Sequence, residues 1–77
     1  MKDICLQILL IYKKNGLCFT GARIPGGKII QLVPDYEKEE VIDAMCELVR
    51  AKYIEIDNKV EEVILLERAV AYLNNKV

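Results

Sequence analysis

The residues that come closest to a phosphate-binding motif lie in one glycine-rich segment, Ala22–Ile29, whose sequence is ARIPGGKI. A phosphate-binding loop begins with glycine, so that the backbone approaches the phosphates, and ends with Ser or Thr, which binds magnesium. Ala22 and Ile29 occupy those two positions here. Pro25-Gly26 instead suits the centre of a type II turn, where glycine tolerates the positive φ. The segment is expected to be a turn, and no cofactor is expected.

Nucleophilic, metal and acid–base chemistry lack the side chains they need. The chain has no His and three widely spaced cysteines, Cys5, Cys18 and Cys46. They form no CxxC pair, and without His no zinc site is completed and no thiol is activated. The adjacent acids Glu39-Glu40 and Glu61-Glu62 do not share a helix face, so they form no acid–base pair. We expect no enzyme, catalytic residue, metal or small-molecule substrate.

The elements that position the side chains must fit within a single domain, residues 1–77. The mean hydropathy is +0.17, and 53% of the residues are hydrophobic. A domain of this size buries only about 60% of the surface that its unfolded chain exposes. Much apolar surface would remain exposed to water in a monomer, and a large exposed apolar patch usually marks an interface. A homo-oligomer, most simply a dimer, or a protein partner is therefore expected.

Cysteine usage and the first apolar run predict a cytoplasmic protein with no membrane partner. Cys5 and Cys46 fall within apolar helical patterns, where a free thiol packs as a small hydrophobe, and this indicates a reducing compartment. The apolar run Ile4–Tyr12 is far shorter than the roughly 20 residues that span a bilayer. Lys13-Lys14 follows it directly, and no signal-peptide cleavage site comes next.

Two stretches have the pattern of helices. Residues 3–14 begin with Asp3 as the expected N-cap and are apolar almost all round, which places this helix in the core or at a subunit contact. Residues 35–52 begin with Asp35 as the expected N-cap. Two parallel rows follow in that second helix and are expected to form one broad apolar face: Val41, Met45, Leu48 and Ile42, Cys46, Val49.

The remaining segments favour strands and turns. Residues 17–34 hold Pro25 and several glycines, so an irregular hairpin or a strand plus loop is expected there, with no helix. Tyr53–Asp57 alternates with period two, as a half-buried strand does, and a turn follows. Residues 60–66 fit either a return strand, followed by a helix over Glu67–Asn75, or the first half of one continuous helix.

Two short motifs resemble those of winged-helix domains. Leu48–Ile54 (LVRAKYI) is similar to the end of the recognition helix, where leucine and then glycine precede Tyr-Ile at the start of the wing; Lys52 stands in the glycine's place. Leu65–Ala69 (LLERA) is similar to the Leu-Thr-Glu-x-Gly that opens the last helix, with Leu66 and Ala69 replacing Thr and Gly. The resemblance covers about residues 35–73. It implies an α+β domain with a helix, an irregular hairpin or loop, a long helix, a β-wing hairpin that includes residues 60–66, and a C-terminal helix.

The resemblance also implies a transcription regulator that places residues 35–52 on DNA as a recognition helix. Charge favours another use, because this helix holds six acidic and three basic residues, whereas Lys and Arg are what neutralise phosphates. Residues 1–34 carry five basic residues against one acidic, and residues 35–77 six against eleven, so the halves could neutralise each other within the fold or between subunits. Nucleic acid, if bound, is expected at Lys13, Lys14, Arg23 and Lys28.

The sequence thus favours a small non-enzymatic, winged-helix-like interaction or regulatory module that dimerises and acts by binding protein. The alternatives are a DNA-binding transcriptional regulator that uses the basic half, and a small inhibitor or adaptor with no ligand of its own. Candidate interface residues are Leu10, Tyr12, Tyr36 and Tyr72, because tyrosine often anchors an interface through a ring with one polar end.

Overall fold

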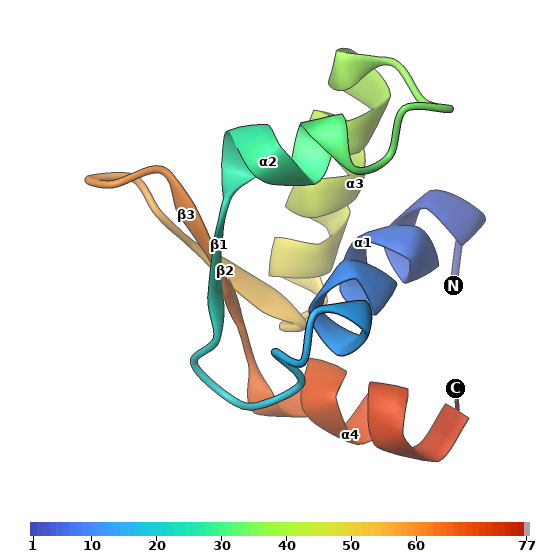
Figure 1. Cartoon of the computed structure of the whole chain (residues 1–77), viewed down its shortest axis with the longest axis vertical. Helices are drawn as coiled ribbons and strands as arrows, with labels where there is room; N and C mark the ends of the chain where they lie inside the picture. Colours follow the sequence, from blue (N-terminus) through green and yellow to red (C-terminus); the bar gives the residue numbers. More distant parts are fainter. Residues whose placement is uncertain (77) are drawn as a thin grey trace.

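The computed structural model describes residues 1–76, which form helices and three short strands (Figure 1). The elements in chain order are α1 (Asp3–Lys14), β1 (Arg23–Pro25), α2 (Gly26–Gln31), α3 (Lys38–Arg50), β2 (Ile54–Asp57), β3 (Glu62–Leu65) and α4 (Glu67–Lys76). The α+β class expected from the sequence is confirmed. No helix in this part of the chain has the length and apolar character needed to cross a membrane.

The three strands form one antiparallel sheet in the order β1-β3-β2. Val63 of β3 stands at the centre, with Ile24 of β1 opposite it on one side and Ile56 of β2 on the other. Residues 60–66 therefore form the turn and the return strand of a hairpin, and α4 begins at Glu67, as expected. We call residues 54–65 the β2–β3 hairpin.

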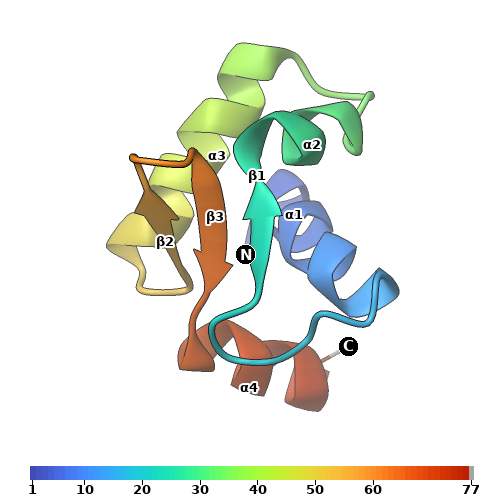
Figure 2. The same cartoon turned by 60° about the vertical axis from the view of Figure 1, so that its left-hand side comes forward.

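Helix α1 lies at the centre of the core, where it packs against α3 and α4 on one face of the sheet (Figures 1 and 2). Its inward residues are buried: Cys5, Ile8, Leu9, Ile11 and Tyr12. Leu48 of α3, Leu65 of β3 and Leu73 of α4 complete the same cluster. The core position expected for an almost wholly apolar helix is thus confirmed.

The segment of residues 17–34 differs from the expected hairpin, because only Arg23–Pro25 is a strand and Gly26–Gln31 forms α2. Ile29 of α2 is 0% exposed, and Val33, two residues after the helix ends, is 2% exposed, so both side chains enter the core. The N–H of Gly26 donates to the carbonyl of Glu61 at 2.9 Å, which ties the start of α2 to the β2–β3 hairpin. Burial of two large side chains therefore outweighs the helix-breaking tendency of the glycines.

Both predicted helix caps at Asp3 and Asp35 are wrong. Helix α3 begins at Lys38 with Glu37 as its N-cap, and the Glu40 carboxylate accepts a hydrogen bond from the backbone N–H of Glu37 at 3.1 Å. A capping box therefore forms two residues later than the expected cap. Helix α1 has Lys2 at its N-cap, and Asp3 is its first residue.

Candidate interaction surface

Helix α3 carries two parallel apolar rows, and the fold covers only one of them. The first row is buried: Val41, Met45 and Leu48. In the second row, Ile42 is 40% exposed, Cys46 is exposed and Val49 is half-buried. The expected broad face is therefore divided between the core and the surface. The exposure of Cys46 also corrects the expectation that its thiol is packed as a small hydrophobe.

The uncovered row borders two hollows between α3 and the β2–β3 hairpin. They adjoin each other, because Ile56 and Asn58 line both, and we call them together the α3–hairpin groove. The first hollow has a volume of about 480 Å³, and its apolar lining is Ile30, Ile42, Met45, Ile56 and Val63. The second has a volume of about 430 Å³ and is lined by Cys46 and Val49 on the helix side. The floor of the groove is thus largely apolar.

Four charged residues line this groove, two on each side. Lys38 and Arg50 lie on α3, whereas Glu61 and Glu55 lie on the β2–β3 hairpin. None of the four forms an ion pair or a side-chain hydrogen bond with another residue in 1–76. The helix rim is therefore basic and the hairpin rim acidic. Arg50 also lies close enough to Glu47 of the same helix to lower the pKa of that carboxyl, without forming an ion pair with it.

The acidic residues of α3 lie mostly on its other flank. Glu40, Asp43 and Glu47 line a separate hollow there, together with Lys2 and Ile4 near the start of α1. The excess of acids that the sequence shows for this helix is therefore directed away from the groove.

The hairpin rim is held in place by polar contacts at both ends of the turn. The Arg23 guanidinium forms ion pairs with Asp57 at 3.0 Å and Glu62 at 3.2 Å, and it lowers the pKa of the Asp57 carboxyl. Asp57 also accepts a hydrogen bond from the N–H of Lys59 at 3.0 Å. Together with the Gly26–Glu61 contact, these bonds attach the hairpin to β1 and α2.

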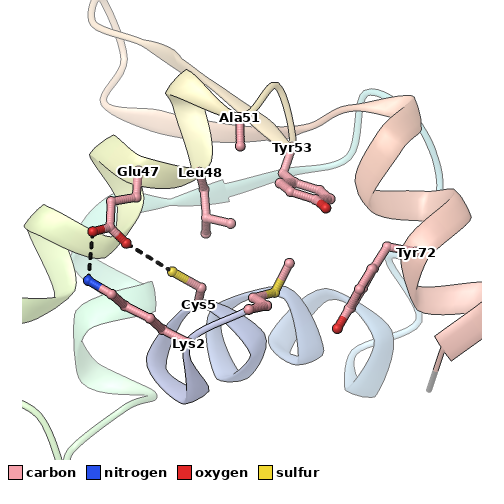
Figure 3. A pocket seen from close by; sticks show the side chains of 8 residues that line it. Lys2, Cys5, Glu47, Leu48, Ala51, Tyr53 and Tyr72 are labelled. Atoms are coloured by element: carbon pink, nitrogen blue, oxygen red, sulfur yellow. Dashed lines mark hydrogen bonds and ion pairs between the residues drawn. The ribbon is translucent and has the colours of Figure 1, made fainter.

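A smaller hollow of about 270 Å³ lies between α1, the end of α3 and α4 (Figure 3). On one side, Lys2 Nζ lies 2.8 Å from Glu47 Oε1, and the Cys5 thiol donates to Glu47 Oε2 at 3.8 Å. On the other side, the rings of Tyr53 and Tyr72 meet edge to face with their centroids 6.0 Å apart. This hollow therefore has one polar wall and one aromatic wall.

The polar wall carries no activated nucleophile. Burial raises the pKa of the Cys5 thiol, and the nearby Glu47 carboxylate raises it further, so the thiol stays protonated at neutral pH. The hydrogen bond to Lys2 lowers the pKa of Glu47 and keeps this carboxylate ionised. Within residues 1–76, no three Cys, Asp or Glu side chains converge where a metal ion could be held.

The four residues expected at a nucleic-acid contact do not form one free basic patch. Arg23 is engaged by two carboxylates, and the ammonium of Lys13 donates to the Leu73 carbonyl at 3.0 Å. Lys14 and Lys28 are exposed. Only Arg23 and Lys28 border the same hollow, beside Leu32. A role of these residues in nucleic-acid binding remains a prediction.

The four residues expected at a protein interface are spread over the molecule. Tyr12 is completely buried, which corrects its assignment, because its hydroxyl finds a hydrogen-bond partner inside the core. Leu10, Tyr36 and Tyr72 are half-buried. Tyr36 donates to Asp3 at 2.6 Å, and Tyr72 lines the small hollow of Figure 3. None of the four lines the α3–hairpin groove.

Sequence reasoning missed the groove, although half of its signal was present. Ile42, Cys46 and Val49 stand out as a second row at helical spacing, and this row makes the apolar arc of α3 unusually wide. The hairpin side, with Ile56 and exposed Val60, gives no such signal, because a half-buried strand has the same alternation whichever element covers it.

No family model, curated protein or solved structure matches the chain. The residues of the groove and of the small hollow are therefore known here from their own geometry alone.

Proposed function

We propose that the protein is a small non-enzymatic interaction module with a winged-helix-like fold, and that it binds protein through the α3–hairpin groove. The order of elements supports the fold description, because α2 lies between β1 and α3 as the second helix of a helix-turn-helix would. The β2–β3 hairpin after α3 corresponds to the wing, and three residues that flank it depart from the family's motifs: Lys52, Leu66 and Ala69.

The observation that carries the function is the uncovered apolar row of α3. A helix of a globular domain normally buries its apolar residues against the core, whereas Ile42, Cys46 and Val49 lie in an open groove. Val60, in the turn of the β2–β3 hairpin, is a further exposed apolar residue. Apolar residues gathered in a groove with a charged rim are typical of surfaces that bind other proteins.

Charge supports a protein partner over DNA. In helix-turn-helix proteins the first residues of the recognition helix approach the bases, and in α3 these positions include exposed Glu39, Glu40 and Asp43. Carboxylates repel phosphates, so the helix lacks the attraction that gives DNA-binding proteins their affinity. Two carboxylates on Arg23 also reduce the charge of the basic half.

Two matched variants test the role of the groove. Ile42→Gln and Phe19→Gln each remove a large exposed side chain, 40% and 52% exposed, but only Ile42 lines the groove. We expect proteins cross-linked to the wild-type chain in cells of its own organism to be retained by Phe19→Gln and lost from Ile42→Gln. Equal loss from both variants, or from neither, would contradict the proposal.

A mobility-shift series with duplex DNA tests the alternative. Binding through Lys14, Lys28 and their neighbours would be strongest at the lowest salt, where counterion release is most favourable. We expect no shift even there. A shift that weakens steeply with salt and disappears in a Lys14→Gln/Lys28→Gln variant would instead support a DNA-binding regulator.

A further inference from the structure

Lys38 and Glu61 are the two charged residues that line the first hollow of the groove, and they lie on opposite sides of it. Lys38 lies in the first turn of α3, where a cation is unfavourable to the helix dipole, and no carboxylate within residues 1–76 pairs with it. Glu61 lies across the groove at a positive φ of 54°, also without an ion-pair partner in that part of the chain. Both charges border an apolar groove, so an oppositely charged group from another molecule would neutralise each of them.

The two rims of the groove are complementary to each other when two copies face each other. If a two-fold axis runs along the groove, the helix rim of each copy meets the hairpin rim of the other. Lys38 then faces Glu61 of the partner subunit, and Arg50 faces Glu55 of the partner subunit. A two-fold axis across the groove would instead place Lys38 against Arg50 of the partner subunit. Charge therefore selects the axis that runs along the groove.

We propose that the α3–hairpin groove is occupied by a second copy of this chain, related by a two-fold axis that runs along the groove. This inference rests on the proposed protein-binding function and names its partner. The helix rim is long, because the 13 residues of α3 rise about 20 Å along a molecule whose longest extent is 28 Å. A specific interface covers roughly 800 Å² per partner, and the chain exposes 4854 Å² in total.

Reciprocal charge reversal tests the pairing. In Lys38→Glu and in Glu61→Lys, each homodimer brings like charges together twice, and we expect self-association to weaken about tenfold or more. In an equimolar mixture of the two variants, both contacts become attractive again. The mixture is expected to recover the wild-type dimer fraction in sedimentation equilibrium. Native mass spectrometry with one variant isotope-labelled would identify the dimer as mixed.

Cys46 provides a second measurement that needs no substitution. It lines the groove, whereas Cys18 does not, and Cys5 is buried in the core. We expect alkylation of Cys46 in the wild-type chain to slow as protein concentration rises, with Cys18 reacting at a constant rate. Circular dichroism of each charge variant confirms that it is folded before its association is measured.

A chain that stays monomeric at several hundred micromolar, with Cys46 reacting at a constant rate, would overturn the second-copy proposal. A dimer whose charge variants do not complement each other would overturn it as well. In either case, loss of a different protein partner from Ile42→Gln would leave the proposed function standing. The proposed function fails if Ile42→Gln retains every contact of the wild-type chain, or if Phe19→Gln loses the same contacts as Ile42→Gln.

Discussion

The hydroxyl of Tyr12 donates a 2.6 Å hydrogen bond to the backbone carbonyl of Val63, and no part of this side chain is exposed. Burying a phenol costs free energy unless its hydroxyl is paired, so this bond is what permits Tyr12 to stand in the core. It also joins α1 to the central strand β3. Among residues 1–76, no buried side-chain nitrogen or oxygen lacks a partner.

Stability should fall at alkaline pH because of Tyr12. Burial raises its pKa well above the ordinary value of 10.0. Above about pH 10, the unfolded chain therefore releases a proton that the folded chain keeps, and the free energy of unfolding declines by up to about 1.4 kcal/mol per pH unit. Below pH 10 this contribution is fully present. Urea unfolding between about pH 8 and about pH 11.5 measures the decline.

Tyr12→Phe is the control for this dependence. It should lower the free energy of unfolding at neutral pH by about 1 kcal/mol through the lost hydrogen bond. Above about pH 10, the free energy of unfolding of Tyr12→Phe should decline less steeply with pH than that of the wild-type chain. The difference in slope should correspond to about one proton, because Tyr36 and Cys5 titrate equally in both proteins. Parallel curves for the two proteins would show that Tyr12 is not the group responsible.

Lys52 is held in a conformation that suits glycine. It follows the C-cap of α3 with a φ of 67°, and its side chain is exposed. Lys52→Gly should raise the free energy of unfolding by about 0.5–1 kcal/mol. This gain is the left-handed strain that glycine relieves, minus the cost of the greater conformational entropy that glycine has in the unfolded chain. Lys52→Ala keeps the Cβ and should give no such gain in chemical denaturation. Equal stability of all three proteins would mean that the backbone here is unstrained.

Among the elements, α2 depends most on its surroundings. It has six residues, two of them glycine, and no side-chain cap, so it would not be stable as an isolated helix. Ile29 and Val33 attach it to the core, and the hydrogen bond from Gly26 to Glu61 attaches it to the hairpin. Because Ile30 on the same helix lines the α3–hairpin groove, α2 supports one end of that surface.

Truncation of Ile29 should therefore destabilise the whole domain. Ile29 is 0% exposed, and Ile29→Ala should lower the free energy of unfolding by about 2–5 kcal/mol through lost burial and a cavity. Leu32→Ala, at a residue 44% exposed, should change it by less than about 1 kcal/mol. Urea denaturation of both variants measures the difference, and similar losses would show that α2 is not anchored through Ile29.

At the scale of the molecule, the two oppositely charged halves of the chain meet within the fold. Each ion pair found in residues 1–76 joins a base from the first half to an acid from the second: Lys2–Glu47, Arg23–Asp57 and Arg23–Glu62. All are exposed, so each contributes little to stability. The charges that border the α3–hairpin groove take no part in these pairs.

Self-association predicts that thermal stability depends on concentration. Because only the folded chain presents the groove, dimer formation should raise the Tm of the wild-type chain as its concentration increases. Ile42→Gln removes an apolar side chain from the groove and should prevent dimer formation, so the Tm of this variant should not depend on its concentration. Because Ile42 is partly exposed, the substitution should leave the fold intact. Differential scanning fluorimetry over a hundredfold range tests this. A constant Tm for the wild-type chain would contradict dimerisation.

Much of the fold follows from patterns within single segments. The apolar run of α1, the two rows of α3 and the alternation in β2 each lie within about a dozen residues of sequence. Helical and strand periodicity depends only on such local spacing, so these elements, and the surplus of apolar residues, were predictable. The lack of His and of paired cysteines likewise needs no structure to be seen.

The folded arrangement alone established α2, the burial of Tyr12 and the covering of one row of α3 but not the other. These features rest on contacts between residues far apart in the chain, such as Tyr12 with Val63 and Gly26 with Glu61. Local spacing shows that two rows of α3 are apolar, but it carries no information on which neighbours cover them. The α3–hairpin groove exists because α1 and the sheet, brought together by burial, cover only one of those rows.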